Sequence, residues 1–241
     1  GSGGGGGPPA PEAKPLVEAT LATEALLGGA LPPSDEVTCI AVHPRIAVLG
    51  TRQGSVFKVD LLAGGRAAKL STNAEHVYDV SLDAEGRFVA SGTADGRISV
   101  MPLVPGTGEA WVCEHGTLPV LSVALCPDYA SPAGDSLVVC AGGEEGRLSL
   151  HRKRLVGVGR STVHEGEGPV TRISWRGKLI AWANDTGVKI FNVLTGQKVS
   201  FIPWPAAGPP GDAGPARGCR LAWADGDRLI IGCGAAVKVA T

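Results

Sequence analysis

The stretch from Val80 to Val100 reads VSLDAEGRFVASGTADGRISV, and it decides the fold. Its last two apolar runs alternate with polar residues on either side of Asp95-Gly96. An Asp-Gly turn between alternating runs is typical of a β-hairpin, because glycine accepts the positive φ that such a turn needs. A second turn, Asp-Ala-Glu-Gly, joins the hairpin to a preceding apolar run. The stretch therefore predicts three short antiparallel strands.

The same three-run pattern occurs five times along the chain. The copies cover residues 39–59, 80–100, 123–150, 173–190 and 221–239. Their equivalent turn positions are Gly54, Gly96, Gly146, Gly187 and Ala236, at successive separations of 42, 50, 41 and 49 residues. A repeat of about 40–45 residues is typical of a four-stranded propeller blade. We therefore predict an all-β, WD-repeat-like β-propeller with about five blades, although the Trp-Asp dipeptide itself is missing.

Composition supports a turn-rich globular protein and argues against several function classes. The 36 glycines and 18 prolines punctuate the whole chain, so long helices are not expected. A formal net charge of −1 argues against a nucleic-acid partner, which needs a concentrated basic surface. We expect no secretory signal and no membrane helix, since no apolar run approaches about 18 residues.

The six cysteines show no C-x-x-C pair and no cluster at metal-ligand spacing. Reduced thiols in a cytoplasmic protein are the expected state, with a disulfide framework as the alternative. These cysteines are Cys39, Cys113, Cys126, Cys140, Cys219 and Cys233.

The chain is expected to divide into a tail and a propeller. Residues 1–35 form a flexible Gly/Pro/Ala-rich tail, in which residues 15–21 are a candidate strand for closing the ring. Residues 36–241 form a partial β-propeller. The fifth repeat reaches its third run at Thr241, so we expect the ring to be truncated at the C-terminus.

Three motifs are weighed as catalytic or phosphate-binding candidates. Residues 157–161 hold two glycines but lack the spacing of a dinucleotide or P-loop motif. Gly134-Asp-Ser136 lacks the Gly-x-Ser-x-Gly elbow of a hydrolase. His164, Glu165 and Glu167 could suggest acid–base or metal chemistry, but their interleaved glycines predict a flexible loop that holds carboxylates poorly. No catalytic, cofactor-binding or metal site is therefore predicted.

Two further motifs are interpreted as surface features. His151-Arg-Lys-Arg154 is the one dense basic run. It is interpreted as a strand end with solvated charges, and the alternative is a contact with an anionic membrane. Asn184-Asp-Thr186 matches a glycosylation acceptor, but it reads as a polar turn before Gly187.

Structural roles are predicted for two groups of residues. Trp175, Trp182 and Trp223 occupy apolar strand positions and are expected to form blade cores. Gly54, Gly96, Gly146 and Gly187 are expected to form the blade turns.

The fourth repeat carries a more specific resemblance. Residues 164–191 read HEGEGPVTRISWRGKLIAWANDTGVKIF and resemble the vacuolar protein sorting-associated protein 41 family. The run LGTRQG at residues 49–54 is similar to the opening blade of that family, and LIIGCGAAVKV at residues 229–239 to a later blade, which usually has Trp where Cys233 stands.

This resemblance implies a non-enzymatic scaffold subunit of the HOPS membrane-tethering complex, which acts in endosome-to-vacuole or lysosome transport and fusion. The implied partners are the other HOPS subunits, a late-endosomal Rab GTPase and, indirectly, SNAREs. The implied location is cytoplasmic and peripheral on late-endosome and vacuole or lysosome membranes, and no cofactor is implied. The alternative is a generic cytosolic WD-repeat adaptor. A propeller hydrolase would need a nucleophile and convergent acids, which the motifs do not supply.

Overall fold

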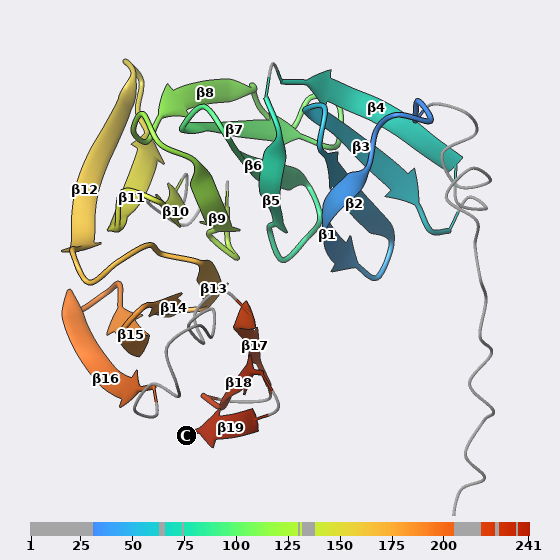
Figure 1. The fold of residues 1–241 in the computed structure, drawn as a ribbon. Coiled ribbons are helices and arrows are strands. Elements are labelled where there is room, and N and C mark those ends of the chain that lie inside the picture. The colour runs from blue at the N-terminus through green and yellow to red at the C-terminus, as the bar shows by residue number, and fades with distance from the viewer. Residues whose placement is uncertain are drawn as a thin grey trace, which may run out of the picture.

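Five antiparallel sheets stand side by side around a common axis in the computed structural model (Figure 1). The structure describes residues 31–62, 66–73, 75–129, 131, 138–204, 218–224, 227–234 and 236–241. These residues contain no helix that could cross a membrane. The predicted all-β propeller with five blades is confirmed. The candidate closing strand at residues 15–21 lies outside the described part of the chain.

Each blade is a meander whose strands pair in chain order. Blade 1 contains β1 (Val37–His43), β2 (Ile46–Thr51), β3 (Ser55–Asp60) and β4 (Arg66–Thr72). Blade 2 contains β5 (Val77–Leu82), β6 (Phe88–Thr93), β7 (Arg97–Pro102) and β8 (Trp111–Glu114). Blade 3 contains β9 (Val120–Leu125), β10 (Val138–Gly143), β11 (Arg147–Lys153) and β12 (Val158–Glu165). Blade 4 contains β13 (Arg172–Arg176), β14 (Leu179–Asn184), β15 (Gly187–Asn192) and β16 (Gln197–Pro203). Blade 5 has three strands among the described residues, β17 (Arg220–Trp223), β18 (Leu229–Cys233) and β19 (Ala236–Ala240).

The first strand of each blade lies nearest the axis, where it packs beside the first strand of the next blade (Figure 1). Because each blade is an antiparallel meander, its first-to-second and third-to-fourth turns lie at one end of the ring, here called the outer-turn end. The second-to-third turns and the connections between blades lie at the opposite end, here called the glycine-turn end.

The second strands are buried on both faces. β6 and β10 stand between two neighbouring blades, whereas β2 packs against blade 2 on one face and has Leu31 packed near its other face. All six residues of β2, β6 and β10 are buried. Such strands read as nearly continuous apolar or small residues, which explains runs such as IAVLGT and VVCAGG. By contrast, six of the seven residues of β16, the fourth strand of blade 4, are exposed.

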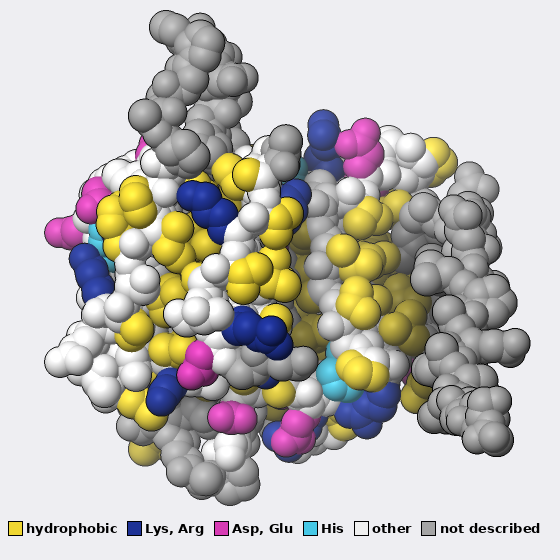
Figure 2. Space-filling model, turned by 90° about the horizontal axis from the view of Figure 1, so that it is seen from below, with side chains coloured by type: hydrophobic (Ala, Val, Ile, Leu, Met, Phe, Trp, Pro, Cys, Tyr) yellow, Lys and Arg dark blue, Asp and Glu magenta, His cyan; other side chains and the backbone are white. Residues whose placement is uncertain are grey.

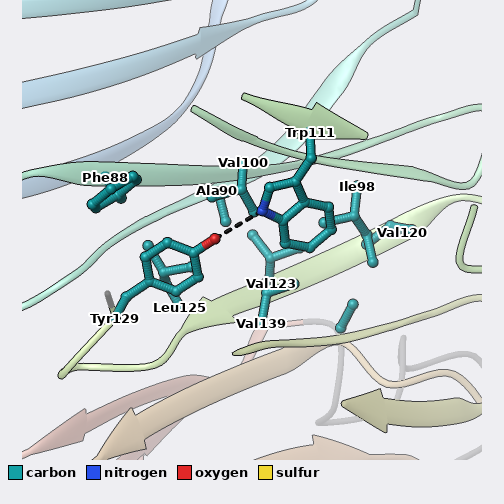
Figure 3. Close-up of a cluster of buried hydrophobic side chains, with 11 residues drawn as sticks. Phe88, Ala90, Ile98, Val100, Trp111, Val120, Val123, Leu125, Tyr129 and Val139 are labelled. Carbon is teal, nitrogen blue, oxygen red and sulfur yellow. Dashed lines mark hydrogen bonds between the residues drawn. The ribbon is translucent and has the colours of Figure 1, made fainter. Parts of the chain in front are cut away.

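The hydrophobic core is divided into layers between adjacent blades. Figure 3 shows the layer between blades 2 and 3, where Trp111 from β8 and Tyr129 from the first turn of blade 3 meet. The Trp111 indole donates a hydrogen bond to the Tyr129 hydroxyl over 2.8 Å, and Phe88 packs against Tyr129 with ring centroids 4.8 Å apart. The two blades are therefore joined by aromatic packing as well as by aliphatic side chains.

Glycine closes the second-to-third turn of the first three blades. Gly54, Gly96 and Gly146 have φ of 87°, 78° and 67°, values that a side chain would make unfavourable. In blade 4 the turn is Asp185-Thr186, so Gly187 lies one residue beyond the place expected from sequence, as the first residue of β15. In blade 5 the turn glycine is Gly234, with φ of 55°, whereas Ala236 begins β19.

A second glycine position admits the neighbouring blade. A Cβ at Gly92 would lie 2.6 Å from a Val120 methyl carbon, and one at Gly142 would lie 2.7 Å from a Val170 methyl carbon. Both valines come just before or at the start of the next blade's first strand. The glycines therefore set the close spacing between blades, since any side chain there would push the next blade away.

Two apolar sheet surfaces remain exposed on blades 1 and 5. On β1, Ile40 and Val42 are 59% and 67% exposed; on β19, Val237 and Val239 are 72% and 60% exposed. Figure 1 shows that the arc of blades is open between β17 and β1. Figure 2 shows hydrophobic side chains gathered on the side of the molecule seen from below.

Candidate functional site

The catalytic candidates from sequence do not assemble a reactive site. Gly157 lies at the tip of the β11–β12 hairpin and Ser161 lies within β12, so no helix N-terminus follows that could hold a phosphate. Gly134-Asp-Ser136 lies outside the described residues. No group of three or more His, Cys, Asp or Glu side chains in the described part of the chain could hold a metal ion.

The loop at residues 165–168 is held in place by a buried polar cluster. Lys189 of β15 is only 5% exposed, and its ammonium donates to the Glu167 carboxylate and, over 2.7 Å, to the Thr186 hydroxyl. Thr186 and the Asn184 amide also donate to Glu167, over 2.9 and 3.3 Å. The hydrogen bond from Lys189 is the largest of the causes that lower the pKa of Glu167 to about 2.

This cluster differs from the flexible loop expected from sequence. Glu167 has φ of 62°, the one positive φ among described non-glycine residues. The hydrogen bonds to its carboxylate compensate for that strained backbone. Glu165, by contrast, projects into solvent with a side chain 73% exposed. The two carboxylates therefore have separate environments, and Glu167 is a structural ion-pair partner.

Replacing Glu167 by glutamine should lower the free energy of unfolding by about 1–2 kcal/mol, because Lys189 would lose its charged acceptor in a largely buried position. The partial exposure of Glu167 keeps the expected value below that of a fully buried pair. Urea unfolding at neutral pH measures the loss.

Glu165→Gln is the matched control, and it should change stability by less than about 0.5 kcal/mol. Equal effects of the two substitutions would show that Glu167 does not hold the loop.

A second polar cluster joins blades 2 and 3. His115 Nδ1 lies 3.0 Å from His151 Nε2, and Cys113 Sγ lies 3.5 Å from His151 Nδ1. Both imidazoles are 1% exposed. Burial lowers the pKa of both histidines, and for His151, where the His115 and Arg160 charges add to burial, it falls to about 3. The pair is therefore neutral at physiological pH and serves as a hydrogen-bonded link between the blades.

Polar side chains also connect the first strands around the axis. The Asp79 carboxylate of β5 accepts hydrogen bonds from the Ser122 hydroxyl over 2.7 Å and from the Val123 amide over 3.0 Å. Ser122 in turn accepts a bond from the Ile173 amide over 3.0 Å, which continues the link into β13. Burial raises the pKa of Asp79, although these bonds and Arg172 oppose the shift. The network fixes three neighbouring first strands and leaves its serine without an imidazole base.

A cavity of about 310 Å³ opens at the outer-turn end of these three strands. Trp175 and Arg176 line one side of it, and the ends of β5 and β9 line the rest. No carboxylate, imidazole or thiol is among its lining residues, which are Ser81, Leu82, Ala84, Ala124, Leu125, Pro127, Ser174, Trp175 and Arg176. The cavity has one positively charged lining residue, Arg176, and no pair of side chains that could act as acid and base.

The three tryptophans expected in blade cores differ in burial. Trp182 is completely buried between blades 3 and 4. Trp175 and Trp223 are partly buried, and their indoles donate to the Gly177 and Ser174 carbonyls over 2.9 and 3.2 Å. Sequence reasoning missed Trp111 and Tyr129, because neither lies in one of the repeated runs and their pairing crosses two blades.

These features define a β-propeller of the WD-repeat kind. Solved structures support that class. A chain of the mitotic checkpoint complex superposes with a TM-score of 0.64 at 15% identity, covering 87% of this chain and 63% of that chain. The designed protein Ika8 gives a TM-score of 0.59 at 19% identity, covering 84% and 57%. At these identities the likeness shows the fold alone.

Sequence relatives identify the family. A family model for the Vps41 propeller, described as "Vps42 beta-propeller", matches residues 30–241. The chain is 35% identical over 218 residues to the vacuolar protein sorting-associated protein 41 homolog of Arabidopsis thaliana, covering 89% of this chain. It is 33% identical over 208 residues to the Homo sapiens homolog, covering 85% of this chain. The chain belongs to the Vps41 β-propeller family. It spans 21% and 23% of the length of these two relatives.

Proposed function

We propose that this chain is the propeller of a non-enzymatic scaffold subunit of the HOPS membrane-tethering complex. The protein then acts in endosome-to-vacuole or lysosome transport and fusion. The observation that carries the proposal is the family relationship over residues 30–241, together with relatives named for vacuolar protein sorting in plants and animals.

The arrangement of polar groups supports a binding role. Glu167 is paired with Lys189, His115 with His151, and Asp79 with Ser122, so these groups stabilise blades and connections between blades. Activity by association needs a rigid body with several surfaces, which stacked blades supply.

The proposed partners are the other HOPS subunits, a late-endosomal Rab GTPase and, indirectly, SNAREs. The proposed location is the cytoplasmic side of late-endosome and vacuole or lysosome membranes, as a peripheral protein. The propeller then helps to hold two membranes together before SNARE assembly.

Affinity purification of the full-length tagged protein, followed by mass spectrometry, tests this proposal. The other HOPS subunits should be recovered, and loss of the protein should leave late endosomes clustered beside an unfused vacuole. Recovery of signalling or ubiquitin-ligase components without any tethering subunit would instead support the WD-repeat adaptor.

A further inference from the structure

One end of the ring repeats a combination of basic and aliphatic residues. At the outer-turn end of three blades, the carbonyl of a basic residue in the first turn accepts a hydrogen bond from the amide of an aliphatic residue in the third-to-fourth turn. The pairs are Arg45 with Leu61 over 3.0 Å, Arg87 with Leu103 over 2.7 Å and Lys178 with Val193 over 2.9 Å. The aliphatic residue that follows each pair points into solvent, with exposures of 74% for Leu62, 42% for Val104 and 79% for Leu194.

Blade 3 shows the strongest form of this pattern. The β11–β12 hairpin reaches the outer edge of the ring (Figure 1), and its turn is closed by the Arg154 amide donating to the Gly157 carbonyl over 3.1 Å. The two residues at its tip, Leu155 and Val156, are 107% and 91% exposed. Turn tips normally carry polar residues, so two adjacent and fully exposed aliphatic side chains point to a ligand that covers them.

The residues that lead into this tip are basic, although the chain as a whole has a net charge of −1. Lys153 and Arg154 come directly before the tip, whereas Arg176 and Lys178 belong to the first turn of blade 4, nearer the axis at the same end of the ring. Segments 153–157 and 176–178 hold no acidic residue. Asp128 is the acidic residue in the described part of the first turn of blade 3.

We propose that the β11–β12 hairpin at the outer-turn end of blade 3 binds the surface of an anionic lipid bilayer. Leu155 and Val156 insert at the boundary between headgroups and acyl chains, and the Lys153 and Arg154 side chains face lipid phosphates. The apolar residues lie at the tip of a hairpin. A fluid bilayer can surround such a tip more readily than a flat protein surface can. This contact goes beyond the proposed function, since tethering through protein partners does not require it.

Flotation of the full-length protein with vesicles tests the contact. The parent protein should bind vesicles of phosphatidylcholine and phosphatidylserine and bind phosphatidylcholine alone much less. Lys153→Gln with Arg154→Gln should lower partitioning about 25-fold, because each charge near the surface contributes about fivefold. Leu155→Ser with Val156→Ser should lower it by about tenfold or more.

Matched controls come from the glycine-turn end of the ring. Leu118→Ser removes an exposed leucine there, and Arg52→Gln with Arg97→Gln changes the net charge by the same amount as the test pair. Both controls should partition like the parent. Equal partitioning of parent and hairpin variants, an equal loss in the controls, or equal binding to the two vesicle types would each overturn the proposal. Thermal melting of every variant verifies that it is folded, and recovery of HOPS subunits is scored separately as the test of the proposed function.

Discussion

Replacing Trp182 by alanine should lower the free energy of unfolding by about 3–5 kcal/mol, the cost of deleting a large aromatic side chain from a core. The side chain is 0% exposed and packs among Val170, Ile173 and Ile180 between blades 3 and 4. Its indole nitrogen has no hydrogen-bond partner among the residues that the structure describes, so the expected loss comes from packing. Denaturant unfolding of the full-length protein, followed by near-ultraviolet circular dichroism, measures it.

Trp175→Ala is the matched control. Trp175 is only partly buried, lines the cavity at the outer-turn end and donates to the Gly177 carbonyl at an exposed position. We expect its replacement to cost about 1 kcal/mol. Equal losses for the two variants would contradict the burial difference on which the prediction depends.

Lowering the pH from 6.5 to 5 should reduce the free energy of unfolding by about 1.5 kcal/mol through His151 alone. Its pKa is lowered from 6.5 to about 3 in the folded protein. The unfolded chain therefore binds a proton in this range that the folded chain does not. The stability is fully present above pH 6.5 and falls by about 1.4 kcal/mol per pH unit below it. His115, whose pKa is also lowered, adds to the slope.

Unfolding curves collected at several pH values measure this slope. His151→Gln should flatten it, because the side chain that remains does not titrate. His43→Gln is the control, since it removes a half-buried histidine at the end of β1 in blade 1 and leaves the pair intact. A slope unchanged by His151→Gln would show that the buried pair does not cause the pH dependence.

The blades were predictable from sequence because their signals are local. Each turn glycine sits between two short apolar runs, and the spacing of these units identifies a propeller without any knowledge of long-range contacts. Alternation along the chain also separates strands with one buried face from the doubly buried second strands. The exact turn residues were less predictable. In blade 4 a two-residue turn places Gly187 in β15, although the repeat spacing hardly changes.

The polar clusters were not predictable in the same way. Glu167 and Lys189 are 22 residues apart, and His115 and His151 are 36 apart; in each pair one residue lies in a strand and the other in a connection between blades. Nothing in either local pattern indicates which side chain lies opposite. The exposed tip at Leu155 and Val156 was also missed, because an apolar pair next to Gly157 reads equally well as the end of a strand.

The hydrogen bonds between the turn of one blade and the connection to the next blade affect how the protein unfolds locally. The Gly54 carbonyl accepts a hydrogen bond from the Asn73 amide, and the Gly96 carbonyl accepts one from His115, so the turn of one blade fixes the segment that leads to its neighbour. Local unfolding should therefore spread from blade to blade as in a row of nearest-neighbour-coupled units. Amide hydrogens in a turn and in the connection that it holds should then exchange at similar rates, because opening of the turn releases both.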